Sequence, residues 1–349
     1  MHIESPRAPR RRRVGVAKEF RPLDEETRVA SPNPNDCAND CANDREQDSG
    51  TLIRSLERHQ REWAAERKVE VDGAGLTLSL DANLISPLCQ TTRADLSTSL
   101  PGILADGEKR GEMSALCSTA ALVHNVFDYW RGRVAAPLVR ACGSTQSQDP
   151  LELHFAATGP AAPTAVHTPG SPADVVLAAR ARPIVVAASF LEPYTQVDNR
   201  PAPELLHAKA TWSGLQACRN LTIDLDSNTQ RFQHLAVARL LGIGQSWTRE
   251  LGERGFRLLY LWYDCGGRAA DRVRAEIDRF RMRAGGELDF EARSWQEFFR
   301  ELCGACRAGR AAGAPASASG DPASAPGDDS HESYLQYLSS RYFPLKPSS

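Results

Sequence analysis

Methionine and aromatic residues are scarce in this chain, and it contains no long uninterrupted apolar stretch. Only 3 of its 349 residues are methionine and 7% are aromatic. A membrane-spanning helix needs about 20 consecutive apolar residues, so we predict that the chain has no membrane partner. The basic N-terminus is followed by no apolar segment, and we expect no secretory leader. These features predict a cytoplasmic protein.

The sequence also lacks an excess of charge of either sign. Its 42 lysines and arginines nearly balance 44 acidic residues, which gives a formal net charge of -2. A nucleic-acid binder can confine its basic residues to one face, so this balance leaves DNA open as a partner. With 41% apolar and 25% charged residues, the composition is typical of a globular protein. The length fits one large domain or two ordinary ones.

Regularly spaced cysteines, which would indicate a disulfide framework, are missing. The nine cysteines are odd in number and irregular in spacing, so we expect reduced thiols. Cys37 and Cys41 have no second pair nearby that would complete a zinc site. Cys303 and Cys306 follow a helical pattern, whereas a redox pair belongs at a helix N-terminus after a strand. We therefore expect no cysteine-based site.

Composition divides the chain into four parts. Residues 1–50 contain a basic run and tandem Cys-Ala-Asn-Asp repeats, and they predict a disordered tail. Residues 51–307 predict the folded domain with an N-terminal helical extension. Residues 308–330 are mostly Ala, Gly, Pro and Ser and predict a flexible linker. Residues 331–349 carry aromatic and leucine residues at helical spacing, so we expect this segment to dock back onto the domain.

Hydrophobic periodicity predicts a sheet between helices. The expected order is neither alternating strand and helix nor all strand, which favours an α/β fold with a mixed central sheet flanked by helices. The short connection between the second and third strands predicts a hairpin. Gly242 is expected to end the helix that precedes it. The expected strands are 151–155, 174–177, 183–190 and 257–263, and the expected helices are 51–68, 112–130, 230–241, 268–283 and 295–306.

Several short stretches resemble, in their order, the PD-(D/E)xK restriction-endonuclease-like nucleases. They are Ala-Asp-Val-Val-Leu at 173–177, Phe-Leu-Glu-Pro-Tyr at 190–194, Leu-Tyr-Leu-Trp-Tyr-Asp at 259–264 and the closing segment 331–343. That superfamily has a core of helix, three-stranded meander, helix and strand. The resemblance implies a restriction-endonuclease-like core over about residues 112–343, with DNA as a possible partner.

The same resemblance implies which residues of this chain stand at the family's catalytic positions. In that family an Asp at the second strand and a Glu-x-Lys on the third hold Mg²⁺, activate water and stabilise the developing charge. Asp174 takes the Asp position, whereas Ala187 and Ser189 stand where the Glu and the Lys should be. The resemblance therefore implies a nuclease fold in which metal-dependent phosphodiester hydrolysis is lost or impaired.

Other residues are candidates for rebuilding the site. Glu152, on the preceding strand, would join Asp174 as a metal ligand if the two strands pair in the right register. Gln233 lies at the start of a helix where the superfamily often has a polar residue that faces the site, which makes Asp174, Ser189 and Gln233 the catalytic candidates. Lys209 or an arginine of residues 257–283 would supply positive charge. Glu192 is five positions from Ala187 and on a regular strand faces away.

The predicted helix 268–283 offers the best candidate surface for nucleic acid. Its outer face carries six arginines, of which we select Arg268, Arg272, Arg279 and Arg283. Acidic residues share this face, and a solvated charged face is its ordinary explanation.

Three hypotheses follow from the sequence. The first is a nuclease-fold protein with lost or impaired hydrolysis that retains DNA binding. The second is an active endonuclease with relocated ligands, which would need Mg²⁺ and no small-molecule cofactor. The third is a protein-interaction module on the same scaffold, since a fold does not fix a function. The sequence leaves the oligomeric state and the DNA target open.

Overall fold

The structure is a computed structural model in which the described residues are 34–100, 102–104, 111–144, 152–157, 173–178, 182–194, 234–252, 255–284, 286–313 and 328–343. Contacts divide the chain into two units, residues 1–42 and 43–349. Within the described ranges, none of the helices combines the length and apolar character that crossing a bilayer requires.

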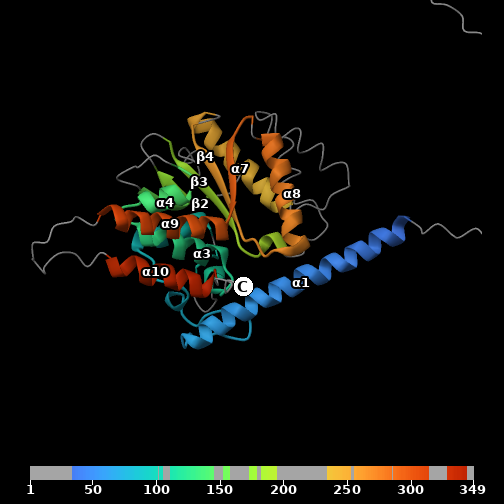
Figure 1. The fold of residues 1–349 in the computed structure, drawn as a ribbon, viewed down its shortest axis with the longest axis horizontal. Helices are drawn as coiled ribbons and strands as arrows, with labels where there is room; N and C mark the ends of the chain where they lie inside the picture. Colours follow the sequence, from blue (N-terminus) through green and yellow to red (C-terminus); the bar gives the residue numbers. More distant parts are fainter. Residues whose placement is uncertain are drawn as a thin grey trace, which may run out of the picture. The chain divides into compact units, whose positions relative to one another are not determined.

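A mixed sheet forms the centre of the second unit (Figure 1). Its five strands lie in the order β1-β2-β3-β4-β5. The first three form an antiparallel meander, and β3, β4 and β5 run parallel. The expected α/β class, the mixed sheet and the hairpin between the second and third strands are therefore confirmed. The strands are β1 (Glu152–Ala157), β2 (Ala173–Ala178), β3 (Ile184–Ser189), β4 (Arg257–Trp262) and β5 (Asp289–Ser294).

Helices cover both faces of the sheet, as Figure 1 shows. Alternation along β3 explains this arrangement, because Val186 and Ala188 pack into one core while Val185 and Ala187 pack into the other. The first core includes α3, α9 and α10, and the second includes α7 and α8. The helices are α1 (Pro34–Glu66), α2 (Gln90–Ser99), α3 (Thr119–Phe127), α4 (Ala136–Ala141), α7 (His234–Leu251), α8 (Gly267–Ala284), α9 (Trp295–Gly313) and α10 (Asp328–Arg341).

Two expected helices differ from the observed ones. The predicted helix 112–130 is split into two 3₁₀ turns, η2 (Glu112–Ser114) and η3 (Asp128–Trp130), on either side of α3. The side chain of Ser118 caps α3 by accepting a hydrogen bond from the Ala121 N–H at 3.2 Å. Helix α7 continues through Gly242 to Leu251, so this glycine does not end it.

Strand β5 was not expected from the sequence. Its apolar residues Phe290 and Ala292 face the α7/α8 core. The alternate positions are charged, and Asp289 forms ion pairs with Arg182 at 2.6 Å and with Arg257 of β4 at 3.3 Å. These partners come from distant segments, and for that reason the sequence Asp-Phe-Glu-Ala-Arg-Ser looks like a loop.

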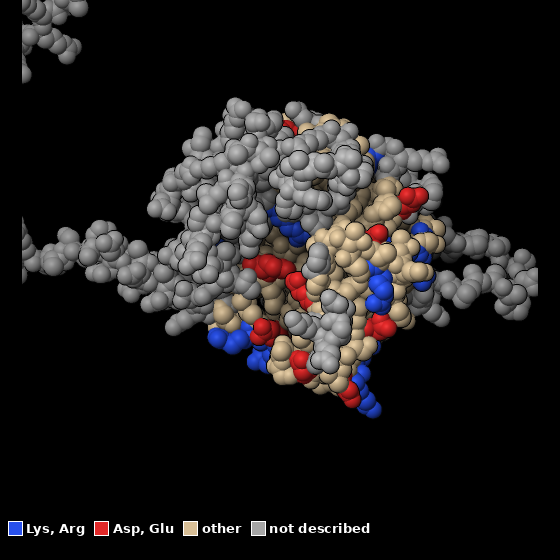
Figure 2. Space-filling view, turned by 180° about the vertical axis from the view of Figure 1, so that it is seen from behind, with Lys and Arg blue, Asp and Glu red and all other residues tan. Residues whose placement is uncertain are grey.

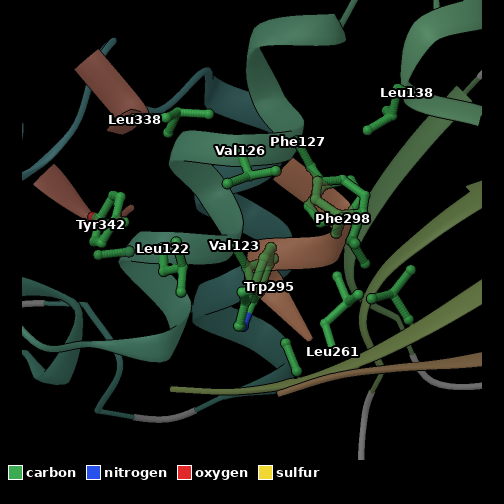
Figure 3. Packing of buried hydrophobic residues seen from close by; sticks show 14 of the residues in the cluster. Leu122, Val123, Val126, Phe127, Leu138, Leu261, Trp295, Phe298, Leu338 and Tyr342 are labelled. Carbon is green, nitrogen blue, oxygen red and sulfur yellow. The ribbon is translucent and has the colours of Figure 1, made fainter. Parts of the chain in front are cut away.

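The C-terminal helix α10 packs into the core below the sheet. Tyr334, Leu338 and Tyr342 are almost fully buried. Figure 3 shows Leu338 and Tyr342 beside Leu122 and Val126 of α3. Tyr334, Leu338 and Tyr342 thus belong to the core cluster that also contains α3 and α9. Helix α1 begins at Pro34, inside the predicted tail, and α9 extends to Gly313, inside the predicted linker. Residues 1–33 and 314–327 lie outside the described residues.

Candidate functional site

The sheet register brings the expected catalytic positions side by side. Because Val175 of β2 pairs with Val186 of β3 in an antiparallel ladder, Asp174 lies opposite Ala187. Ala187 pairs in turn with Tyr260 of β4. Asp174, Ala187 and Tyr260 therefore form one row across three strands, on the face that α7 covers. The positions that the resemblance assigned to the second and third strands are adjacent in space.

The Asp174 carboxylate is already engaged by two donors. Its Oδ2 atom accepts a hydrogen bond from the Ala188 N–H at 2.6 Å and forms an ion pair with Nη2 of Arg239, on α7, also at 2.6 Å. Nη1 of Arg239 donates to the Ala188 carbonyl oxygen at 3.0 Å. Asp174 is only 12% exposed and Arg239 30%. Arg239 thus joins α7 to a side chain of β2 and to the backbone of β3.

A second carboxylate, that of Glu192 in η4 (Glu192–Tyr194), lies just beyond the end of β3. Its Oε2 accepts from the Phe190 N–H at 2.7 Å, and its Oε1 accepts from the Thr119 hydroxyl at 2.5 Å. Thr119 is the first residue of α3, and a negative charge at a helix N-terminus is favourable. Glu192 follows the end of β3, so the alternation rule for a regular strand does not govern its direction.

Electrostatics place Arg239 under the influence of both carboxylates. Burial disfavours the charged guanidinium, but attraction to Asp174 and Glu192 outweighs the burial and raises the pKa of Arg239. The guanidinium is therefore a permanent cation in this part of the molecule. In a partly desolvated site such an ion pair is far less screened by solvent than a surface pair.

Ser189, which stands at the position expected for the lysine, is held by two hydrogen bonds. Its hydroxyl oxygen lies 3.1 Å from the Tyr260 hydroxyl, which donates to it, and its carbonyl oxygen accepts from the indole Nε1–H of Trp295 at 3.1 Å. Burial raises the pKa of Tyr260 to about 12, so this phenol stays neutral near pH 7. Ser189 therefore connects β3 to β4 and α9, and it contributes no positive charge.

These residues do not fit the Mg²⁺ that the family's chemistry uses. Mg²⁺ prefers hard oxygen ligands in octahedral geometry. Ala187 provides no side-chain oxygen, one oxygen of Asp174 is held by two nitrogen donors, and the Arg239 guanidinium repels a second cation. Across the described part of the chain, no group of three or more His, Cys, Asp or Glu side chains is placed to hold a metal ion.

Glu152, the other candidate metal ligand, is not brought to Asp174. Glu152 pairs with Ala178, at the opposite end of β2, and four residues of strand separate that position from Asp174 by roughly 13 Å. The Glu152 carboxylate is 76% exposed and lies 3.5 Å from the imidazole of His154. Gln233 and Lys209 lie outside the described residues. The structure therefore does not form the Asp174–Glu152 metal pair.

The arginines of α8 are largely paired with acidic neighbours. Arg279 contacts Glu276 at 3.3 Å, Arg281 contacts Asp278 at 2.6 Å, and Arg274 contacts Asp271 and Asp264, each at 2.6 Å. Arg268 and Arg272 are exposed, and the side chain of Arg283 lies outside the described residues. On the face seen in Figure 2, acidic and basic side chains are intermixed in the part that is described. The α8 surface is therefore mixed in charge.

Sequence reasoning missed Arg239, the residue that organises the site. One signal was present, since Arg239 interrupts the apolar sequence Leu-Ala-Val-Ala-Arg-Leu-Leu of residues 235–241. A charged residue inside an apolar helix is seldom buried without a partner. The sequence did not reveal that the partner is Asp174. No family model, curated protein or solved structure matches the chain.

Proposed function

We propose that this chain is a restriction-endonuclease-like, DNA-processing protein that has lost metal-dependent phosphodiester hydrolysis. The observation that supports this most directly is the ion pair between Asp174 and Arg239 at 2.6 Å. The Arg239 guanidinium neutralises Asp174, the carboxylate that would hold the metal. Its opposite neighbour, Ala187, has no group that binds a cation.

The chemistry of phosphodiester hydrolysis explains why an ion-paired Asp174 beside Ala187 disfavours activity. A phosphodiesterase of this type needs a metal to polarise the phosphate and to lower the pKa of the attacking water. It also needs a cation close to the developing negative charge. Here the cation is bound to the carboxylate itself, and the lysine position is a buried serine hydrogen-bonded to Tyr260.

An active endonuclease with relocated ligands has less support. Such a site needs a second carboxylate beside Asp174 that is free to bind metal. Glu192, just beyond the end of β3, is no such ligand, because both its oxygens accept hydrogen bonds, from Thr119 and from the Phe190 backbone. A protein-interaction module on this scaffold remains the alternative if DNA is not bound at all.

Plasmid nicking by the full chain tests the proposal. Supercoiled DNA is incubated with the protein in Mg²⁺ or Mn²⁺, with EDTA and the Asp174→Ala variant as controls. We expect no nicking above the level of Asp174→Ala. Nicking that requires a divalent metal and disappears in Asp174→Ala would show that the chain is an active nuclease and would refute the proposed loss of hydrolysis.

A further inference from the structure

The guanidinium of Arg341, at the end of α10, lies in a pocket that matches its five N–H donors. Its Nε donates to Gln60 Oε1 at 3.2 Å, and its Nη1 donates to the Asn83 carbonyl oxygen at 2.8 Å and to the Tyr337 hydroxyl at 2.7 Å. Its Nη2 donates to the side-chain oxygen of Asn83 and to the Leu116 carbonyl oxygen at 3.4 Å. Five N–H groups thus meet five oxygens, and the planar fork of donors is fully used.

Aromatic rings surround the same guanidinium. The ring centroids of Trp63, Tyr342 and Tyr337 lie 4.1, 4.7 and 6.0 Å from its Cζ atom. Arg341 is 0% exposed, and in the described part of the chain its partners are neutral oxygens and aromatic rings, with no carboxylate among them. A buried cation without a counter-ion is stable only where hydrogen bonds and ring faces replace its hydration shell. The pocket is therefore built for a flat cation with many donors.

Most of the acceptors in this pocket lie outside α10. Four of the five oxygens belong to Gln60, Asn83 and Leu116. The side-chain amide of Asn83 donates to the Met113 and Ala115 carbonyl oxygens at 2.8 and 2.9 Å, and these two bonds fix the direction of its oxygen. Their positions therefore do not depend on the guanidinium alone, and the pocket should persist when that group is removed.

We infer that this pocket is a binding site for an alkylguanidinium group, and that α10 occupies it through Arg341. The C-terminal helix is thus held by a side chain that acts as a ligand, and without that side chain the site accepts the same group from solution. An ammonium group does not replace it, since three donors cannot meet five fixed oxygens. The pocket includes neither Asp174 nor Arg239, so this inference does not depend on the proposed function.

The experiment is chemical rescue of Arg341→Ala by N-ethylguanidinium, which is the group that the substitution removes. The melting temperature of the full chain is measured in millimolar N-ethylguanidinium chloride and in NaCl of the same concentration. Arg341→Ala should gain at least about 2 °C, since a ligand that binds only the folded state stabilises it. Wild-type protein should show no gain, because Arg341 already fills the site.

Two controls separate the pocket from a general effect of the salt. Ethylammonium chloride should not stabilise Arg341→Ala, and N-ethylguanidinium should not stabilise Arg58→Ala, because Arg58 is 72% exposed on α1 and its removal opens no pocket. The double variant Gln60→Met/Arg341→Ala lacks one acceptor of the site. Titration calorimetry should show that it binds N-ethylguanidinium at least about threefold more weakly than Arg341→Ala does.

If Arg341→Ala does not fold, recovery of its circular dichroism spectrum on adding N-ethylguanidinium becomes the measurement. Two results would overturn the inference. One is the absence of both stabilisation and recovery in Arg341→Ala. The other is an equal gain with ethylammonium, or an equal gain in Arg58→Ala or the wild type, because the effect would then not come from a guanidinium site at Arg341.

Discussion

Arg341, the last residue of α10, hydrogen-bonds to both the backbone carbonyl and the side-chain amide oxygen of Asn83. Its guanidinium is fully buried, and it also contacts the side-chain oxygen of Gln60, on α1, at 3.2 Å. The ring of Trp63 lies 4.1 Å from the same guanidinium. One side chain therefore connects the C-terminal helix to the N-terminal helix and to the loop around Asn83.

We expect Arg341→Ala to destabilise the protein by about 3–5 kcal/mol, because it leaves several buried oxygens without a donor. Arg341→Lys should recover only part of this loss, since an ammonium group cannot reproduce the planar fork of donors. Urea unfolding followed by circular dichroism measures the difference. Arg58→Ala is the control, because Arg58 is 72% exposed and its pair with Glu62 is 3.8 Å long. A loss below about 1 kcal/mol for Arg341→Ala would contradict the assigned role.

Protonation of His124 should make the protein less stable in mild acid. His124 is 1% exposed on α3, and burial lowers its pKa below 6.5, although Asp128, 3.6 Å away, acts in the opposite direction. The unfolded chain therefore binds a proton at this residue at a higher pH than the folded chain. Stability is retained above pH 6.5 and falls as the pH decreases below it.

The measurement is the change in unfolding free energy between pH 7.5 and pH 5.5 for the wild type and His124→Gln. We expect a smaller change in the variant, because its side chain does not titrate. His154→Gln, which removes an imidazole that is 51% exposed on β1, is the control. Equal pH dependence in His124→Gln and the wild type would show that His124 is not responsible.

The strands that could be predicted are those whose own residues indicate that they are buried. β3 is buried at every position, and its run Ile-Val-Val-Ala-Ala-Ser marks a central strand without further information. β5 has charges at alternate positions, and its strand character depends on Arg257 and Arg182, which the sequence places far away. Edge strands stabilised by long-range ion pairs are for this reason missed by local patterns.

Gly242 illustrates the same limit for helices. A glycine after an apolar helical run commonly ends the helix. Here α7 continues, and a β-carbon at the nearby Gly244 would lie 2.9 Å from Cδ1 of Leu288. Close packing against Leu288 explains the glycine at 244, and this contact is invisible until the tertiary structure is known.

The candidate site was predictable in position but not in chemistry. The strand order and the short hairpin place Asp174 opposite Ala187 in the register of β2 and β3. Local patterns did not identify Arg239, because its helix α7 is far from Asp174 in the sequence and supplies the cation across the face of the sheet that it covers. An arginine that pairs with a buried aspartate can lie at any distance from it along the chain, so no sequence spacing predicts the pair.

The charged side of β5 should contribute measurably to stability. Asp289 accepts from Arg182 and Arg257, and its carboxylate is 30% exposed. We expect Asp289→Ala to cost about 1–2 kcal/mol, less than a fully buried pair because solvent screens part of the interaction. Glu152→Ala, on the opposite edge strand and 76% exposed, is the control and should change stability by less than about 0.5 kcal/mol. Equal effects of the two substitutions in urea unfolding would contradict the importance of the β5 network.

Binding of DNA by α8 should be weak and strongly dependent on salt. Arg274, Arg279 and Arg281 are paired with acidic residues, so few cations remain to contact phosphate. We expect fluorescence anisotropy with a labelled duplex to show binding only at low ionic strength. Arg268→Ala/Arg272→Ala should lower the slope of log K against log salt by about 2, since each phosphate contact releases close to one counterion.

Arg281→Ala serves as the control for that measurement. This arginine lies on the same helix, but it contacts Asp278 at 2.6 Å, and its removal should leave the salt slope unchanged. If Arg281→Ala and Arg268→Ala/Arg272→Ala reduce the slope equally, ion pairing on α8 does not decide which arginines reach phosphate. If the wild-type chain shows no binding even at low salt, DNA is not its partner, and the scaffold must act through another macromolecule. The comparison of these two variants therefore separates a nucleic-acid surface from an ordinary solvated face.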